Sequence, residues 1–282
     1  METYKIGIIG AGVIADFHAQ AIQAMDGAEL VAAFARKEDK AAAFASKYDC
    51  QGYSDLDTFL AHPDMQVVTI CSVSGAHLEH ATAAANAGKH IICEKPLEIT
   101  TERIDQMIRV CEENNVSLSG VFPRRFNDST HIFKQVIEEG RLGKIVLCDT
   151  AIKWWRSQEY YDSGAWRGTW DLDGGGALMN QSIHTIDLML HLLGDVSSVS
   201  ASGGLEAHKD IEVEDVEGLK TVVTAQITLE TPNMPPTVES IEPVVAKVGD
   251  DVGFTISAND PEGGKLTYRA LNNPSGFKKK IR

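Results

Sequence analysis

A short glycine-rich segment near the start of the chain most constrains the fold. Residues 5–9 are apolar except for Lys5 at their start, and residues 10–15 follow with the pattern G-x-G-x-x-A. Gly10 permits a tight turn, and Gly12 allows the backbone amides after it to approach a pyrophosphate. Ala15 is small enough for the next helix to pack on the strand. The glycines can also serve only to shape a strand-to-helix turn, but their place directly after an apolar run favours a dinucleotide-binding turn.

Composition and charge exclude several classes of partner. The 282 residues carry a formal net charge of −14, which argues against nucleic acid and against an anionic membrane surface. No apolar run is long enough to span a bilayer, and residues 1–4 lead into strand-like sequence without a signal segment. The five cysteines form no C-x-x-C pair, so free thiols are expected rather than disulfides or zinc ligands. We therefore expect a cytoplasmic protein that binds no metal.

The first part of the chain alternates short apolar strands with helical stretches, which is typical of a doubly wound parallel sheet. This α/β pattern predicts a Rossmann dinucleotide-binding domain over residues 1–122. The predicted strands are residues 5–9, 28–34, 65–72, 90–93 and 116–121. The predicted helices begin at Asp16 and then cover residues 38–47, 53–62, 76–87 and 101–114.

The pattern changes after Arg124, and we expect a mixed α/β substrate domain over residues 123–230. It contains predicted helices at residues 128–139 and 177–193 and a long predicted strand at 144–155. Alternating residues in 196–205 and 218–229 predict antiparallel strands with one solvated face. We therefore expect an open, antiparallel-rich sheet in this domain.

The composition shifts again near residue 231. Six of the nine prolines lie from Pro232 onward, and residues 259–264 have strong turn chemistry between two short predicted strands, 252–258 and 265–270. Residues 231–282 therefore resemble a β-rich fragment of an immunoglobulin-like or cadherin-like module, too short for a whole sandwich.

Two later segments carry side chains suited to proton chemistry. Lys95 follows the predicted strand 90–93, where burial and neighbouring groups can adjust an ammonium for proton work. Asn180 and His184 are four residues apart in the predicted helix 177–193 and would share a face of it. On spacing alone, Lys95 can equally be an ordinary surface lysine, and a packed helical histidine is the more common interpretation of His184.

The order of several motifs resembles one known family. Residues 10–12, 71–77, 88–90, 93–97, 166–168 and 174–184 follow one another as they do in the Gfo/Idh/MocA oxidoreductases, and the resemblance covers about residues 4–217. It implies a Rossmann domain and a second α/β domain whose open sheet often mediates homo-oligomers. It also implies oxidation or reduction of a sugar-like hydroxyl with NADP or NAD as cofactor. By motif position Lys95 would orient the reacting hydroxyl, and His184 would exchange its proton. Many relatives have Asp where Asn180 stands, so a proton relay through this position is in doubt.

The resemblance also implies a set of cofactor contacts. Together with the glycine turn, the expected cofactor-binding residues are Gly10, Gly12, Val13, Ile14, Arg36, Ser72, Ser74, His77, Glu94, Lys95, Trp166 and Arg167. The strand 28–34 is followed by Arg36 and Lys37 and no carboxylate stands at its end, which favours NADP over NAD. Alternatively, Arg36 stacks on the adenine.

The substrate class and some side chains stay open. We expect hydride transfer between a nicotinamide and a sugar, sugar derivative or sugar nucleotide. An NAD-dependent glycosidase of the same fold, or a chain that binds cofactor without turnover, are the alternatives. Arg124, Arg125 and Arg156 fit an anionic sugar nucleotide or an ordinary surface, and Trp154 and Trp155 fit a sugar-stacking platform or sheet packing. The acidic residues 212–217 are expected to form a solvated loop.

Overall fold

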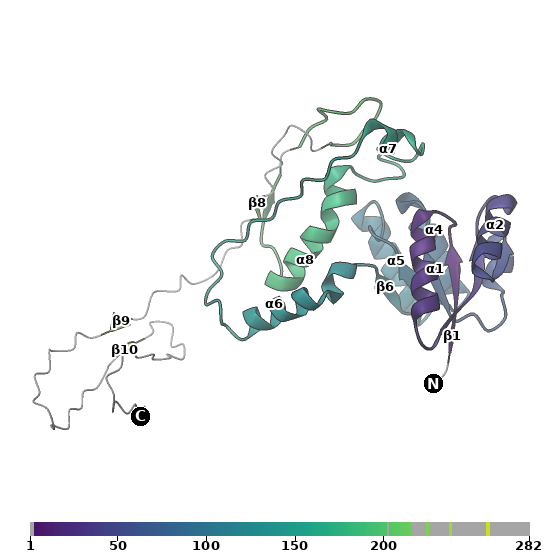
Figure 1. The fold of residues 1–282 in the computed structure, drawn as a ribbon, viewed down its shortest axis with the longest axis horizontal. Helices are drawn as coiled ribbons and strands as arrows, with labels where there is room; N and C mark the ends of the chain where they lie inside the picture. The colour runs from purple at the N-terminus through teal and green to yellow at the C-terminus, as the bar shows by residue number, and fades with distance from the viewer. Residues whose placement is uncertain (1–2, 202, 216–223, 226–236, 239–257, 260–282) are drawn as a thin grey trace, which may run out of the picture. The chain divides into compact units, whose positions relative to one another are not determined.

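The computed structural model describes residues 3–201, 203–215, 224–225, 237–238 and 258–259 (Figure 1). Contacts divide the chain into two compact units, the first made of Met1–Leu142 with Leu147–Ile227 and the second of Gly143–Val146 with Thr228–Arg282. The second unit is described only at residues 143–146 and at two short antiparallel strands, β9 (Thr237–Val238) and β10 (Ala258–Asn259). Most of the predicted immunoglobulin-like fragment therefore lies outside the described residues, and the domain boundaries at 122 and 230 stay predictions.

A six-stranded parallel sheet with the order β3-β2-β1-β4-β5-β6 organises the first 120 residues. Parallel strands need crossover connections, and the alternation of strands and helices in the sequence supplies them. The strands are β1 (Tyr4–Ile9), β2 (Ala28–Phe34), β3 (Gln51–Tyr53), β4 (Val67–Ile70), β5 (His90–Cys93) and β6 (Leu118–Gly120). The helices between them are α1 (Val13–Ala24), α2 (Glu38–Tyr48), α3 (Leu56–Leu60), α4 (His77–Asn86) and α5 (Thr101–Glu113).

Helices cover both faces of this sheet, as the ribbon in Figure 1 shows. Alternate side chains of β1 point to opposite faces, so Ile8 packs with α1 and α2 while Ile9 packs with α3, α4 and α5. Both isoleucines are fully buried, and each contributes about 1.5–3 kcal/mol by leaving water. The predicted doubly wound Rossmann fold is confirmed.

One predicted helix of this part begins later than the sequence suggested. Residues 53–62 were expected to be helical, but Gln51–Tyr53 forms β3 beside β2, and α3 covers only Leu56–Leu60. The Asp55 carboxylate accepts a hydrogen bond from the Thr58 backbone N–H at 2.8 Å and so caps α3. The edge strand was missed because three residues are too few to show a period.

The strand order reverses between β1 and β4, which are neighbours in the sheet although β2 and β3 separate them in sequence. The loops after neighbouring strands diverge at such a point and leave a crevice at the carboxyl edge. The glycine turn follows β1, residues 71–77 follow β4, and Glu94 and Lys95 follow β5. The predicted site residues of the first domain therefore lie along one edge.

Helices make up most of the regular secondary structure in the described part of the rest of the first unit. It contains the 3₁₀ turn η2 (Pro123–Phe126), α6 (Asp128–Glu138), α7 (Gln158–Asp162), the π-helical turn η3 (Ala177–Ser182) and α8 (Ile183–Leu193). Helices α6 and α8 lie side by side (Figure 1), and Lys134 Nζ donates to the His191 carbonyl at 2.8 Å. Among described residues no helix is both long and apolar enough to cross a bilayer.

The long strand expected at residues 144–155 is wrong, since this segment has no strand structure. A strand persists only where another strand satisfies its backbone groups, and no described strand lies alongside this one. The antiparallel strands expected further on are confirmed only over a short length, where β7 (Val199–Ser200) pairs with β8 (Thr224–Ala225).

Candidate functional site

The glycine turn is shaped to leave backbone amides open at the start of α1. Gly10 has φ +108°, and a Cβ there would lie 2.7 Å from the Cys71 carbonyl oxygen, so only glycine fits. Gly12 is the N-cap of α1, with no side chain capping the first turn, and a Cβ at Gly12 would meet nothing within 4 Å. Val13 and Ile14 are 74% and 43% exposed despite being apolar. This cradle fits a pyrophosphate at a helix N-terminus with apolar surface beside it.

The residues expected at the adenosine end follow β2 and β4. Arg36 is exposed just beyond Phe34, and Ser72 Oγ lies 3.0 Å from Nδ1 of His80. The His80 ring packs edge-on to Phe34, with centroids 6.2 Å apart. Burial lowers the pKa of His80, and the nearby His77 and Arg36 add to this. His80 was missed because a second histidine on α4 has no sequence signal of its own.

His77 and Ser74 were expected to line the cofactor site, and both are buried. His77 is 1% exposed, and its Nδ1 lies 2.9 Å from the Pro96 carbonyl oxygen while its Nε2 lies 3.2 Å from that of Ser72. Ser74 is 6% exposed. His77 thus ties the loop after β4 to the loop that carries Lys95.

Glu94 belongs to a hydrogen-bonded chain that crosses three elements. His18 Nε2 on α1 lies 2.9 Å from Glu94 Oε1, and Thr69 Oγ1 on β4 lies 2.7 Å from His18 Nδ1. An ionised carboxylate only accepts, so His18 donates from Nε2 and accepts the Thr69 hydroxyl at Nδ1. Burial by itself raises the pKa of Glu94, but the bonds from His18 and the Lys95 N–H lower it overall. His18 was missed, although its place in the helix after the glycine turn is a usable signal.

Lys95 is brought to the continuous helical segment in which η3 carries Asn180 and α8 carries His184. Its Nζ donates to the Asn180 carbonyl oxygen and to Asn180 Oδ1, both at 2.9 Å. Burial lowers the pKa of Lys95, while the charges of Glu94 and Asp173 oppose this. Two of the three ammonium N–H groups are therefore held in place, and the third is left for a ligand oxygen.

Asp173 stands behind Asn180 and was missed at the sequence level. It is 2% exposed, and its Oδ1 accepts from Asn180 Nδ2 at 2.6 Å while its Oδ2 accepts from the Gly168 N–H at 2.9 Å. Burial raises the pKa of Asp173, and these hydrogen bonds oppose the rise. An acid directly before three glycines was the available signal. Asn180 is an amide and cannot itself act as a carboxylate. It is, however, hydrogen-bonded directly to a carboxylate, that of Asp173.

His184 is the second residue of α8, which directly follows the π-helical turn that holds Asn180. Its Nδ1 is buried and has no hydrogen-bond partner in the described part of the chain. Burial lowers the pKa of His184, and the charges of Lys95 and Arg124 add to this. A neutral imidazole keeps one ring nitrogen with a free lone pair, which can accept a proton at neutral pH. π-helical turns of this kind occur often at functional sites.

Trp166 and Arg167 lie in the same part of the molecule. The Arg167 guanidinium is 4.5 Å from the centroid of the Trp166 ring and 4.2 Å from that of Tyr160. Its charge also lowers the pKa of Lys95, though less than burial does. The structure thus brings Glu94, Lys95, Asn180, His184 and Arg167 together.

The acidic run at 212–217 was expected to be a solvated loop, and this is wrong for its described part. Glu214 accepts the N–H groups of Gly176 and Leu178 at 3.1 and 3.0 Å. Asp215 is 2% exposed and accepts three backbone N–H groups, from residues 206, 207 and 208. These carboxylates accept backbone N–H groups of the loops around the site, as a capping side chain does at the start of a helix. Sequence composition does not reveal this role.

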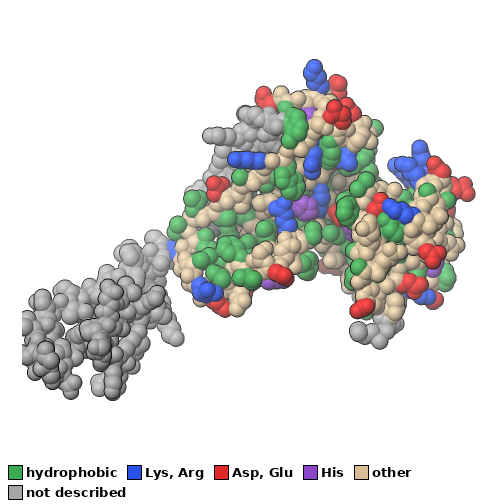
Figure 2. All heavy atoms as spheres, in the orientation of Figure 1, with side chains coloured by type: hydrophobic (Ala, Val, Ile, Leu, Met, Phe, Trp, Pro, Cys, Tyr) green, Lys and Arg blue, Asp and Glu red, His purple; other side chains and the backbone are tan. Residues whose placement is uncertain are grey.

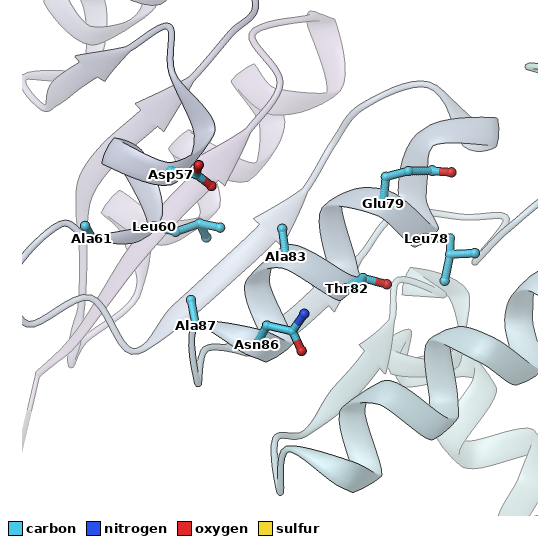
Figure 3. Close-up of a pocket in the computed structure, with 9 residues that line it drawn as sticks. All are labelled: Asp57, Leu60, Ala61, Leu78, Glu79, Thr82, Ala83, Asn86 and Ala87. Atoms are coloured by element: carbon cyan, nitrogen blue, oxygen red, sulfur yellow. The ribbon is translucent and has the colours of Figure 1, made fainter.

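A separate hollow lies between α3 and α4 (Figure 3). It is lined by Asp57, Leu60, Ala61, Leu78, Glu79, Thr82, Ala83, Asn86 and Ala87. None of the predicted site residues is among them, and the Glu79 carboxylate is already paired with Arg103 at 2.8 Å.

A parallel sheet whose strand order reverses beside a glycine turn at a helix N-terminus has the geometry of a dinucleotide-binding fold. Comparisons with known proteins agree. The family model described as "Oxidoreductase family, NAD-binding Rossmann fold" matches residues 4–121, and that described as "GFO/IDH/MocA C-terminal domain" matches residues 131–235. The chain belongs to the Gfo/Idh/MocA family.

Several individual proteins are similar to the chain. The WlbA dehydrogenase from Bordetella pertussis, solved with NADH and UDP-GlcNAcA, is 35% identical with a TM-score of 0.70, covering 76% of this chain and 62% of that one. A levoglucosan dehydrogenase solved with NADH and levoglucosan is 28% identical with a TM-score of 0.68 and the same coverage. The inositol 2-dehydrogenase of Rhizobium meliloti is 29% identical over 74% of this chain and 61% of its own length. The chain spans 54 to 62% of the length of the relatives it matches.

Proposed function

We propose that the chain is an NAD(P)-dependent oxidoreductase that acts on a hydroxyl of a sugar, a sugar derivative or a sugar nucleotide. The observation that carries this proposal is the Lys95 ammonium, which two hydrogen bonds to Asn180 hold close enough to His184 for its charge to act on that ring. The complexes of similar dehydrogenases with UDP-GlcNAcA and levoglucosan support the substrate class.

The chain's own residues divide the work between binding and proton transfer. A bound nicotinamide supplies the hydride acceptor in the oxidation direction. Lys95 donates its remaining N–H to the substrate hydroxyl oxygen and stabilises the negative charge that develops there. His184 accepts the hydroxyl proton, and its lowered pKa keeps the ring neutral for this at neutral pH. Asn180 and Asp173 hold the ammonium in position.

The cofactor would lie along the carboxyl edge of the sheet. The open amides at Gly12 would meet its pyrophosphate, with Val13 and Ile14 against its apolar parts. The nicotinamide end would be bordered by Glu94, Trp166 and Arg167. The adenosine end would lie near Ser72. The buried His77 and Ser74 would fix the loops that carry these residues. The NAD-binding family model and the NADH complexes of two neighbours support a nicotinamide dinucleotide at this edge.

We propose NADP as the preferred cofactor because Arg36 is exposed at the end of β2, where a 2′-phosphate would lie. The test compares the affinities of the whole chain for NADPH and NADH by fluorescence titration, in the native protein and in Arg36→Ala. We expect NADPH to bind more tightly, and the substitution to reduce its affinity about tenfold while leaving NADH within about twofold. Equal loss for both cofactors would instead fit stacking of Arg36 on the adenine.

Turnover is tested separately from cofactor binding. The chain is incubated with NAD or NADP and a panel of sugars, sugar acids and sugar nucleotides, while absorbance at the nicotinamide band is followed. Net reduction of the cofactor supports an oxidoreductase, and its loss in Lys95→Met and His184→Gln identifies the site. Cofactor binding without turnover would favour a non-catalytic chain, and release of free sugar from a glycoside without net reduction would favour the glycosidase alternative.

We further propose a reducing, cytoplasmic environment, supported by five free cysteines, of which Cys93 and Cys111 are buried. Oligomerisation through the sheet of the second domain remains a proposal as well, and sedimentation of the whole chain tests it.

A further inference from the structure

Two arginines flank the same indole ring next to the candidate site. The Arg124 guanidinium lies 5.4 Å from the centroid of the Trp154 ring, and the Arg156 guanidinium lies 5.8 Å from it. Arg156 is also 5.0 Å from the centroid of Tyr160. Like charges gathered in this way repel one another, and aromatic faces offset only part of that repulsion. We call Arg124, Trp154 and Arg156 the arginine clamp.

The charges of the clamp have no acidic partner in the part of the chain that the structure describes. Neither Arg124 nor Arg156 forms an ion pair with a described carboxylate, and the buried Nε of Arg156 has no acceptor there. Arg125 is the contrast, since its guanidinium is paired with both carboxylate oxygens of Asp187 and serves to join η2 to α8. A guanidinium without an acidic partner keeps terminal N–H donors that a ligand anion can take.

The segment that carries Trp154 and Arg156 is held in place although it is not a strand. The Arg156 carbonyl oxygen accepts from Nε2 of His208 at 2.7 Å, and Trp155 stacks on the His208 ring with centroids 5.2 Å apart. His208 in turn bonds through Nδ1 to the buried Asp215 at 2.9 Å. A shallow hollow lined by Lys153, Trp154, Trp155 and Arg156 opens beside it, with cations and aromatic rings but no acid in its lining.

The clamp lies next to the residues proposed for catalysis. Arg124 donates from Nη1 to Thr185 Oγ1 at 2.7 Å, and Thr185 directly follows His184 on α8. The charge of Arg156 reaches Lys95, because after burial it is among the causes that lower the pKa of that lysine. Figure 2 shows Lys and Arg side chains gathered with hydrophobic ones and a histidine on the face over α8.

We propose that the arginine clamp binds an anionic group of the substrate, a carboxylate or a phosphate attached to a sugar. The sugar ring, or the nucleobase of a sugar nucleotide, would then lie against Trp154. This inference rests on the proposed function and narrows its substrate class from sugars in general to acidic ones. Guanidinium groups match the geometry of both anions by paired N–H donors. A chain with net charge −14 attracts no anion at long range, so a local cluster of cations is what such a substrate requires.

The test measures binding by the whole chain in the presence of saturating NADH, using the quenching of tryptophan fluorescence or calorimetry. The probes are D-glucuronate for a carboxylate, D-glucose 6-phosphate and UDP for a phosphate, and D-glucose as the neutral sugar. We expect at least one anionic probe to bind at least tenfold more tightly than glucose, with an affinity that falls as salt is added. The probe that binds most tightly identifies which anion the clamp takes.

Variants then assign the binding to the clamp. Arg156→Gln and Arg124→Gln are each expected to reduce affinity for the anionic probe about tenfold to a hundredfold, and to leave NADH affinity within about twofold. Arg156→Lys keeps the charge and should retain part of the affinity. Arg109→Gln on α5, an exposed arginine outside the site, is the charge-matched control and should change nothing. Thermal unfolding of every variant shows that it is folded.

The inference is overturned if glucose binds as tightly as every anionic probe, or if the clamp variants match Arg109→Gln. Its failure differs from failure of the proposed function. Oxidation of neutral sugars with unchanged rates in Arg156→Gln keeps the function and removes the inference. Clamp-dependent anion binding without any hydride transfer keeps the clamp and removes the function.

Discussion

Asn180 donates from its side-chain Nδ2 to Oδ1 of Asp173 at 2.6 Å, and this bond decides which way the amide faces. With Nδ2 turned to the carboxylate, Oδ1 is turned to Lys95 Nζ at 2.9 Å. The negative charge of Asp173 is thereby aligned with the ammonium through a polarised amide. The Lys95 ammonium thus has the electrostatic support of the Asp173 carboxylate without a direct hydrogen bond to it.

Substitution of Asp173 tests this arrangement. Asp173→Asn retains an acceptor for Asn180 but removes the charge, so the pKa of Lys95 should fall further and the alkaline limb of the rate profile should move to lower pH. Asp173→Ala also frees the amide, and we expect it to lower kcat by a further factor of about ten. The pH dependence of kcat checks both. An alkaline limb in Asp173→Asn that coincides with that of the native protein would contradict the electrostatic role.

The histidine sets the acid side of the same profile. Because burial and Lys95 lower the pKa of His184, the ring should stay neutral to below its ordinary value near 6.5, and oxidation should persist into mildly acidic buffer. His184→Gln should remove the acid limb and lower kcat about a hundredfold or more. Lys95→Met also removes a nearby positive charge, so the pKa of His184, followed by NMR, should rise. A fall or no change there would show that the two groups are not coupled.

Substitutions of the two glycines in the turn should have different effects on stability and on cofactor binding. Gly12→Ala meets nothing within 4 Å, so the free energy of unfolding should change by less than about 1 kcal/mol while NADH or NADPH affinity falls about tenfold or more. Gly10→Ala adds a Cβ 2.7 Å from the Cys71 carbonyl at φ +108° and should destabilise the fold by about 1–3 kcal/mol. Chemical unfolding and fluorescence titration measure the two effects. Equal loss of stability in both variants would mean that Gly12 serves only the fold.

Glu214 supports the turn that carries Asn180. Glu214→Gln replaces one of two accepting oxygens with an NH₂ group that faces a backbone N–H, so it should destabilise the chain by about 1–3 kcal/mol. The Lys95 and Asn180 geometry should loosen, and kcat should fall more than NADH affinity. Glu206→Gln, at an exposed position in the same segment, is the control for charge. A kcat unchanged at a temperature where the variant is folded would remove Glu214 from the support of the site.

The sequence predicted the first half of the fold well because its signals are local. Apolar runs such as β1 and β5, and the turn residues after them, glycine after β1 and proline after β5, are visible in neighbouring residues. The parallel order follows from the alternation of strands and helices. The strand expected at 144–155 failed because a strand also needs a partner, which its own residues do not encode.

For the candidate site, the sequence by itself determined the glycine cradle and the presence of Lys95, Asn180 and His184 in motifs of one family. Only the tertiary structure decided that Lys95 reaches Asn180 across 85 residues of sequence and that Asp173 stands behind it. The same holds for the arginine clamp. In the sequence Arg124 and Arg156 look like ordinary arginines, and only the tertiary structure shows that neither is paired with a described carboxylate. The physical reason is that hydrogen bonds and burial depend on distances in space, whereas sequence patterns report only spacing along the chain.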